Sequence, residues 1–198
     1  MKAIKWKINP FFTYSLIQED ILKLYVDSIV NPANSRLAHG GGLAKLIKDN
    51  FGGEFFQKES NDYINKFGEI QPGNCGVTGT GNVKHKYIKH VIHAVGPIWN
   101  SGKDNEPLIL KSAFNNVLLE AKKLKIKTLA IPPISTGIFN FPKDLAADIF
   151  YNCINSFANK NEDYPAHVIM SIFDETTYNI FYKKHLEFIK NYKNELIL

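Results

Sequence analysis

Two short segments of this chain combine polar side chains with glycines in a pattern that suits an anionic ligand. Residues 30–47 read VNPANSRLAHGGGLAKLI and place Asn31, Asn34 and His39 ahead of three consecutive glycines. Glycines that open a helix let backbone N–H groups approach an oxyanion without interference from Cβ atoms, and the helix dipole favours negative charge there. A tight turn needs only one glycine, so the run of three favours phosphate over a plain turn.

The second segment, PPISTGIFNFP at residues 132–142, also leads into a predicted helix. It offers Ser135, Thr136 and Gly137 as hydroxyl and backbone donors, followed by the apolar Ile138 and Phe139. Two donor-rich loops at neighbouring strand ends could hold two linked phosphates between them. The two segments together therefore predict a diphosphate ligand.

A diphosphate that carries sugars and a base needs further groups at its two ends. Asp20, Asn34 and Phe173 follow other predicted strands and could supply two polar contacts and an apolar slot. Each also has an ordinary structural explanation, because Asp20 could stabilise a turn and Phe173 could belong to the core.

Other catalytic and nucleotide-binding motifs are not present in the sequence. GTGNVK from Gly79 has a lysine where the dinucleotide fingerprint requires its last glycine, and no GxxxxGK[ST] string occurs. HGGG is also found in the oxyanion loop of esterases, but the required GxSxG nucleophile motif is absent. We therefore exclude an esterase of that type.

The histidines do not form a predicted metal site. On a strand His90 and His93 point to opposite faces, and His85 lies ~26 Å from His93 if the chain is extended. His167 and His185 each stand alone and are interpreted as structural or surface histidines. We expect no metal and no cofactor.

Hydrophobic periodicity predicts alternating strands and helices that position these loops. Strands are predicted over residues 4–8, 11–18, 24–31, 128–135 and 166–174, with a strand, turn and strand within 73–97. Helices are predicted from Leu43 onward and over residues 54–66, 108–124, 141–157 and 176–192. This order indicates an α/β fold with a mainly parallel sheet covered on both faces, whose ligands bind beyond the carboxyl ends of the strands.

Composition narrows the class of protein. The 198 residues are 44% hydrophobic, which fits a single globular domain spanning 1–198. The net charge of +5 is spread over interspersed lysines and acids, and KKLKIK at residues 122–127 is interpreted as a solvated helix end more readily than as a polyanion contact. The two cysteines lack CxxC spacing, and no apolar stretch approaches the ~20 residues of a membrane span. We expect a cytoplasmic protein, with the nucleus as the alternative, and no membrane association.

Three ordered segments resemble the hallmark motifs of the macrodomain family, which binds ADP-ribose. They are VDSIVNPANSRLAHGGGLAKLI (residues 26–47), VIHAVGPIW (91–99) and IPPISTGIFNFP (131–142), within a matching region of about 16–173. The resemblance implies a three-layer α/β/α fold with a mixed, mainly parallel sheet and a C-terminal helix at about 176–193. Asn34, His39 and the glycine run with Leu43 are most similar to the viral-type and archaeal-type branch of the family.

The resemblance assigns residues to each part of ADP-ribose. Asp20 would accept from the adenine amino group, Ile21 would donate a neighbouring backbone contact, and Phe173 would pack on the adenine face. Asn34 would bond the distal ribose, with His39 alongside, and Asn31 is either a ligand contact or a turn-stabilising residue. The diphosphate and the remaining contacts fall to Ala33, Gly41, Gly42, Leu43, Ser135, Thr136, Gly137, Ile138 and Phe139.

The resemblance leaves two classes of function open. As an enzyme, the protein would hydrolyse mono-ADP-ribose from Asp or Glu of modified proteins, or act on O-acetyl-ADP-ribose or ADP-ribose 1″-phosphate, with Asn34, His39 and Phe139 as catalytic residues. As a non-catalytic reader, it would only bind the modification. Ala44 stands where many hydrolytic members carry an aspartate, which favours the reader, whereas Asn34 with His39 favours the enzyme.

The implied partners are ADP-ribose and mono-ADP-ribosylated proteins. General RNA or poly(A) binding draws only on the overall charge and the adenine site, so we do not expect a nucleic-acid partner. We expect a monomer. Two further departures from the family pattern, Glu19 before Asp20 and Pro32 in place of an alanine, should not block the pocket.

Overall fold

The structure is a computed structural model that describes residues 2–160 and 165–195, with side chains described through residue 190. Its centre is a seven-stranded sheet in the order β1-β2-β7-β6-β3-β5-β4. The outer pairs β1/β2 and β4/β5 are antiparallel, and all other neighbours are parallel. The strands are β1 Ala3–Lys7, β2 Thr13–Ile17, β3 Ser28–Ala33, β4 Cys75–Thr78, β5 His90–Val95, β6 Thr128–Ile131 and β7 His167–Ser171.

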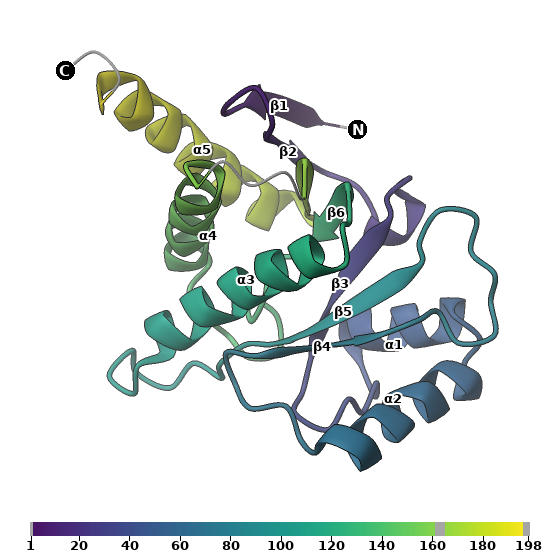
Figure 1. Ribbon diagram of the computed structural model, residues 1–198. Helices are drawn as coiled ribbons and strands as arrows, with labels where there is room; N and C mark the ends of the chain where they lie inside the picture. The colour runs from purple at the N-terminus through teal and green to yellow at the C-terminus, as the bar shows by residue number, and fades with distance from the viewer. Residues whose placement is uncertain (1, 161–164, 196–198) are drawn as a thin grey trace.

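Helices cover both faces of this sheet. Figure 1 shows α1 and α2 on one side and α3, α4 and α5 on the other, which agrees with the contacts between the elements. Their bounds are α1 Gly42–Asn50, α2 Glu54–Phe67, α3 Glu106–Lys123, α4 Lys143–Ala158 and α5 Glu175–Glu195, with a short 3-10 helix η1 at Ile21–Lys23. The predicted three-layer α/β/α fold with a mixed, mainly parallel sheet is confirmed.

Each face of the sheet has its own apolar core. On the side of α3, α4 and α5, Phe114, Phe150 and Tyr151 are almost completely buried against the strands. On the side of α1 and α2, Ile47 and Phe56 pack against another set of strand residues. Because the central strands are covered on both faces, they appear in the sequence as continuous apolar runs instead of alternating ones.

Two predicted strands begin later than their apolar patterns suggest. The chain turns between Ile8 and Phe12, because the Asn9 side-chain oxygen accepts from the N–H groups of Phe11 and Phe12, so β2 starts only at Thr13. Similarly, β3 starts only at Ser28. The carboxylate of the preceding residue, Asp27, accepts hydrogen bonds from the N–H and hydroxyl groups of Thr128 and so ties this segment to β6. In both places a local polar side chain ends the extended run.

The parallel strands bring the two unusual loops together. The glycine loop follows β3 and the second loop follows β6, and these strands are neighbours in the sheet. The ends of β2 and β7, which precede Asp20 and Phe173, lie at the same edge because these strands also run parallel. None of the described helices is long and apolar enough to cross a lipid bilayer.

A buried pair of tyrosines gives a test of the larger core. The hydroxyl groups of Tyr14 and Tyr151 lie 2.9 Å apart, and that of Tyr151 donates to the carbonyl oxygen of Phe181 at 2.9 Å. Tyr151→Phe should lower the free energy of unfolding by about 2 kcal/mol, because it leaves the buried Tyr14 hydroxyl without an acceptor. Tyr14→Phe should cost only about 1 kcal/mol, because Tyr151 keeps its bond to Phe181. Urea unfolding followed by circular dichroism measures both, and equal or reversed losses would contradict this arrangement.

Candidate functional site

The glycine loop presents free backbone donors at the start of α1. The N-cap residue is Gly41, and no side chain makes a capping hydrogen bond there. The first N–H groups of an α-helix have no partner within the helix, so those of Gly42 and Leu43 are available to an external acceptor. Gly42 has a φ of 57°, a left-handed conformation that favours glycine.

The second loop offers another set of free donors. Within the described residues, the N–H groups of Ser135, Gly137, Ile138 and Phe139 make no hydrogen bond, whereas Phe141 N–H donates to the Ser135 carbonyl oxygen at 3.0 Å. Ser135 has a φ of 65°, a strained value for a residue with a side chain. Its Oγ is buried and has no hydrogen-bond partner in the described structure. The Oγ lies against Gly96, so the free N–H groups of this loop are the donors that a ligand could use.

The two loops face each other across a narrow space. A Cβ atom placed on Gly42 would lie 3.9 Å from the Cδ1 atom of Ile138, whose side chain is 84% exposed. The uncapped start of α1 therefore lies beside the second loop. This is the arrangement that the sequence predicts for a cradle around linked phosphates, with Gly41 to Leu43 on one side and residues 135–139 on the other.

Asp20 and Phe173 lie at adjacent strand ends at the same edge of the sheet. The Ser171 hydroxyl donates to the carbonyl oxygen of Glu19 at 2.8 Å, which ties the end of β7 to the segment that carries Asp20. Asp20 caps η1 by accepting from Leu22 N–H with one carboxylate oxygen, and Phe173 is 79% exposed. Ile21 follows Asp20 with its side chain buried, so only its backbone could contact a ligand.

Asn34 directly follows β3 and shapes its own loop. The sheet edge with the two loops, Asp20, Phe173 and Asn34 is called the cleft below. The side-chain oxygen of Asn34 accepts from the N–H groups of Arg36 and Ala38, and its amide donates to the Ala38 carbonyl oxygen at 2.7 Å. Asn34 also lines an open groove of about 630 Å³ together with Phe139. The other lining residues are Ser35, Arg36, Ala38, Glu69, Pro72, Val95, Gly96, Pro97, Ile98, Asn100, Asp104, Glu106 and Ile109.

One carboxylate organises the loop that borders this groove. Glu106, at the start of α3, accepts hydrogen bonds from the N–H groups of Asn100, Ser101, Gly102 and Asp104. Desolvation raises the pKa of the Glu106 carboxyl, but these backbone donors outweigh it and lower the pKa to about 2. Glu106 is therefore an anchor for the loop and not an acid poised to exchange protons at neutral pH.

A buried polar network lies behind the glycine loop. The Asn31 amide nitrogen lies 3.4 Å from Nδ1 of His39 and 3.0 Å from Nδ1 of His93. The Nε2 atoms of the two imidazoles lie 2.9 Å from the Ser60 hydroxyl and 2.8 Å from the Thr78 hydroxyl, respectively. With this amide orientation both Nδ1 atoms accept, so both histidines are neutral and carry their proton on Nε2.

Burial keeps these imidazoles neutral. Burial, with a smaller contribution from the nearby positive charge of Lys48, lowers the pKa of His39 to about 4. Desolvation also lowers the pKa of His93 to about 3, with a smaller contribution from His39, whose ring stacks at a centroid distance of 5.4 Å. Neither ring carries a positive charge near neutral pH, so neither can act there as a cationic acid.

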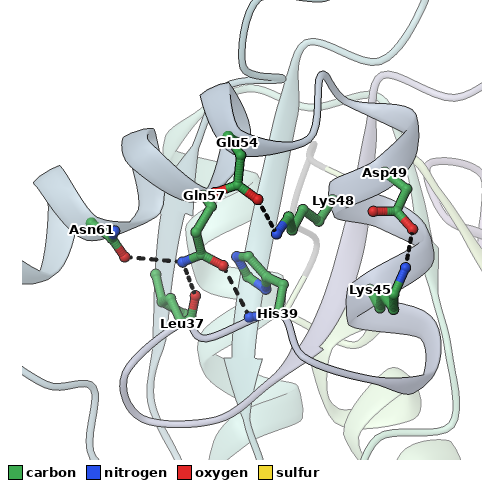
Figure 2. A network of polar contacts seen from close by, with 8 residues as sticks. All are labelled: Leu37, His39, Lys45, Lys48, Asp49, Glu54, Gln57 and Asn61. Carbon is green, nitrogen blue, oxygen red and sulfur yellow. Dashed lines mark hydrogen bonds and ion pairs between the residues drawn. The ribbon is translucent and has the colours of Figure 1, made fainter.

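Gln57 of α2 holds the backbone of the glycine loop from outside. Figure 2 shows its side-chain oxygen accepting from His39 N–H and its amide donating to the Leu37 carbonyl oxygen. Leu37 is fully buried and has a φ of 52°, so the loop is fixed in a conformation that a free chain avoids. Gln57 gave no signal in the sequence, because only its place on α2 brings it to the loop.

The structure brings most of the predicted residues to one edge of the sheet, at the carboxyl ends of β2, β3, β6 and β7, but places His39 behind the glycine loop. Both ring nitrogens of His39 lie in the buried network, and only 3% of the residue is exposed. Asn31 is fully buried, which fits the structural explanation, although its side-chain oxygen has no partner in the described structure. Ala33 and Ala44 are both buried beside the loop. Because position 44 is an alanine, it supplies no carboxylate to the site. Among the described residues, no group of three or more His, Cys, Asp or Glu side chains is placed to hold a metal ion.

Comparison with known proteins identifies the family. The family model described as Macro domain matches residues 30–150, so the chain belongs to the macrodomain family. A solved Oceanobacillus iheyensis macrodomain with ADP superimposes with a TM-score of 0.87 at 30% identity, covering 96% of this chain and 98% of that one. A mutant of the same macrodomain was solved with ADPR and gives a TM-score of 0.86 at 29% identity, over 96% of this chain and all of the other.

Two relatives found by sequence differ in length. A protein of Pantoea vagans named O-acetyl-ADP-ribose deacetylase 1 is 36% identical over 85% of this chain and 96% of its own length. An uncharacterised Thermotoga maritima protein is 41% identical over 85% of this chain, but the match spans only 28% of that protein.

The neutrality of His39 can be tested directly. In an NMR titration of its ring carbon-bound protons, we expect the imidazole to stay neutral as the pH falls through 6.5 and to titrate only near pH 4, because charging it costs desolvation. Since the unfolded chain binds this proton at a higher pH than the folded chain, His39 makes stability fall as the pH decreases from about 6.5 to about 4. The urea-unfolded chain is the control and should titrate near 6.5. A midpoint near 6.5 in the folded protein would contradict the buried network.

Proposed function

We propose that this chain binds ADP-ribose in the cleft and hydrolyses mono-ADP-ribose from Asp or Glu side chains of modified proteins. The observation that carries the binding proposal is the pair of facing loops with unpaired N–H groups, at the uncapped start of α1 and at residues 135–139. Membership in the macrodomain family and the neighbouring structures with ADP and ADPR agree with a diphosphate in this position.

The ends of the cleft fit the two halves of the ligand. At one end the free carboxylate oxygen of Asp20 would accept from the adenine amino group, and the exposed ring of Phe173 would cover the base. At the other end Asn34 would bond the distal ribose, and Phe139 would brace the sugar where both residues line the groove. Whatever is attached to the distal ribose would then extend into the groove.

The proposed hydrolysis relies on holding the water and the sugar in place more than on a catalytic acid of the protein. The ester between ribose and a protein carboxylate is activated, so holding a water and the sugar in place can supply much of the rate. Glu106 is committed to backbone donors, and position 44 is an alanine, so the proposal has a phosphate oxygen of the substrate orient or deprotonate the water. His39 would act as a positioning residue, because its buried ring supports the loop that carries Asn34.

Three alternative functions would use the same cleft. The name of the Pantoea vagans relative supports deacetylation of O-acetyl-ADP-ribose, which would use the same cleft with an acetyl ester in place of the protein. The alanine at position 44 supports a reader that binds the modification without removing it. Hydrolysis of ADP-ribose 1″-phosphate is a further reaction of the same class.

The experiment incubates the protein with a target mono-ADP-ribosylated on Glu or Asp and follows free ADP-ribose over time. We expect time-dependent release that falls by about 100-fold in Asn34→Ala, because the distal ribose loses its contact in the transition state. Asn34→Asp keeps the acceptor for the N–H groups of Arg36 and Ala38 but loses the amide donor. It also loses the bond to the Ala38 carbonyl oxygen, and it should still be slow because the amide donor is missing.

Controls separate binding from catalysis. Asn65→Ala, on the exposed surface of α2, should leave release unchanged. Calorimetric titration with ADP-ribose should give an affinity about 10-fold lower in Asp20→Ala, since one hydrogen bond to the base is lost. Binding of the modified target without release would identify a reader, and release only from O-acetyl-ADP-ribose would identify a deacetylase. Failure of the native chain to bind ADP-ribose at all would overturn the whole proposal.

A further inference from the structure

A second surface of interest lies at the opposite edge of the sheet from the cleft. The cleft is at the carboxyl ends of β3 and β6, so the residues that precede these strands and β5 lie at the far edge. There Lys89 N–H donates to the Asp27 carbonyl oxygen at 2.9 Å, and Lys127 N–H donates to the Asp27 carboxylate at 3.0 Å. Three segments that are far apart in the sequence therefore meet at Asp27.

Lysines gather on these segments without acidic partners. The set, called here the basic edge, consists of Lys84, Lys86, Lys89, Lys125 and Lys127, and all five are exposed. None of them forms an ion pair with an acid in the described part of the chain, whereas Lys45, Lys48 and Lys58 on α1 and α2 each do. Asp27 brings a single negative charge to this surface, and its Oδ2 accepts from the N–H groups of Lys127 and Thr128 and from the Thr128 hydroxyl, so the lysines keep an excess of positive charge.

Two tyrosines lie within the basic edge. The rings of Tyr25 and Tyr87 pack edge to face, with centroids 4.9 Å apart and an interplanar angle of 81°. Tyr25 is 79% exposed, and the Lys86 ammonium lies 5.1 Å from the centre of the Tyr87 ring. The Tyr25 ring contacts Tyr87, and most of its surface is still open to solvent. An aromatic surface beside unpaired cations suits a ligand that carries both negative charge and flat rings.

We infer that the basic edge binds single-stranded nucleic acid, with backbone phosphates on the lysines and a base stacked on Tyr25. Single strands expose the faces of their bases, which stack on aromatic side chains with little sequence preference, while phosphates follow a positively charged track. A duplex hides its base faces, so Tyr25 would have nothing to stack on. An acidic protein would satisfy the lysines but would not use the ring.

This surface is separate from the proposed ADP-ribose site. Tyr25 and Tyr87 precede β3 and β5, whereas the free donors of the cleft follow β3 and β6. Both sites could be occupied together, and the nucleic-acid proposal does not depend on the proposed function of the cleft. A protein with both sites would act on ADP-ribose while held on a strand.

The test measures fluorescence anisotropy of a labelled oligothymidylate of about 12 nucleotides, long enough to cross a surface of this kind. We expect binding that weakens steeply as salt is added, because lysines that contact phosphates release counterions. Reversal of two charges in Lys86→Glu/Lys89→Glu should weaken binding at least about 10-fold. The matched control Lys111→Glu/Lys183→Glu makes the same change in net charge on the exposed surfaces of α3 and α5 and should have a much smaller effect.

Substitutions of Tyr25 distinguish the binding of nucleic acid from the binding of other polyanions. Tyr25→Ala should weaken binding by about 10-fold and Tyr25→Phe should not, because the stacking face is kept. Excess ADP-ribose and the substitution Asp20→Ala should leave the oligonucleotide affinity unchanged. The proposal is wrong if the oligonucleotide does not bind, if Tyr25→Ala binds as tightly as the native chain, or if ADP-ribose displaces the oligonucleotide.

Discussion

The architecture of the cleft depends on one constraint: backbone N–H groups from two loops must stay unpaired while the loops face each other. Free donors tend to find internal acceptors, so the loops have to be held in conformations that prevent it. Leu37 and Ser135 both adopt left-handed backbone angles, at 52° and 65°. Hydrogen bonds hold each loop. The Gln57 side chain bonds to the backbone of the first loop, and the Phe141 N–H donates to the Ser135 carbonyl oxygen in the second.

The buried network behind the glycine loop extends this hold into the sheet. Asn31 lies between two neutral imidazoles, and the hydroxyls of Ser60 and Thr78 close the two ends. A charged ring would bring an uncompensated charge into the interior, so neutrality and burial depend on each other. The loop that carries Asn34 is therefore supported by an uncharged network at neutral pH, and the chemistry that we propose for it is the positioning of a sugar.

Much of the fold could be predicted from the sequence because its signals are local or follow from strand direction. The helix at Glu54–Phe67 was predicted to within one residue from its hydrophobic period, and the loops at the ends of β3 and β6 were expected to meet because parallel strands share one edge. The starts of β2 and β3 were predicted too early, since single polar residues, Asn9 and Asp27, ended the extended runs.

The orientation of individual side chains could not be predicted in the same way. The place of His39 depends on Asn31, Ser60 and His93, which come from other elements, so no local signal predicts that its ring lies behind the glycine loop. The basic edge was missed for a similar reason. Lys89 and Lys127 are far apart in the sequence, and only the register of β3, β5 and β6 brings them to one surface.

The central claim is that the two facing loops hold the diphosphate of ADP-ribose, and amide chemical shifts test it most directly. In a ¹H–¹⁵N correlation spectrum titrated with ADP-ribose, we expect large and saturable shifts at Gly42, Leu43, Gly137 and Ile138, because their N–H groups gain acceptors. The amides of Lys160 and Lys183, away from the cleft, should stay in place. Saturable binding that leaves the four loop amides unshifted, or no binding at all, would contradict the account.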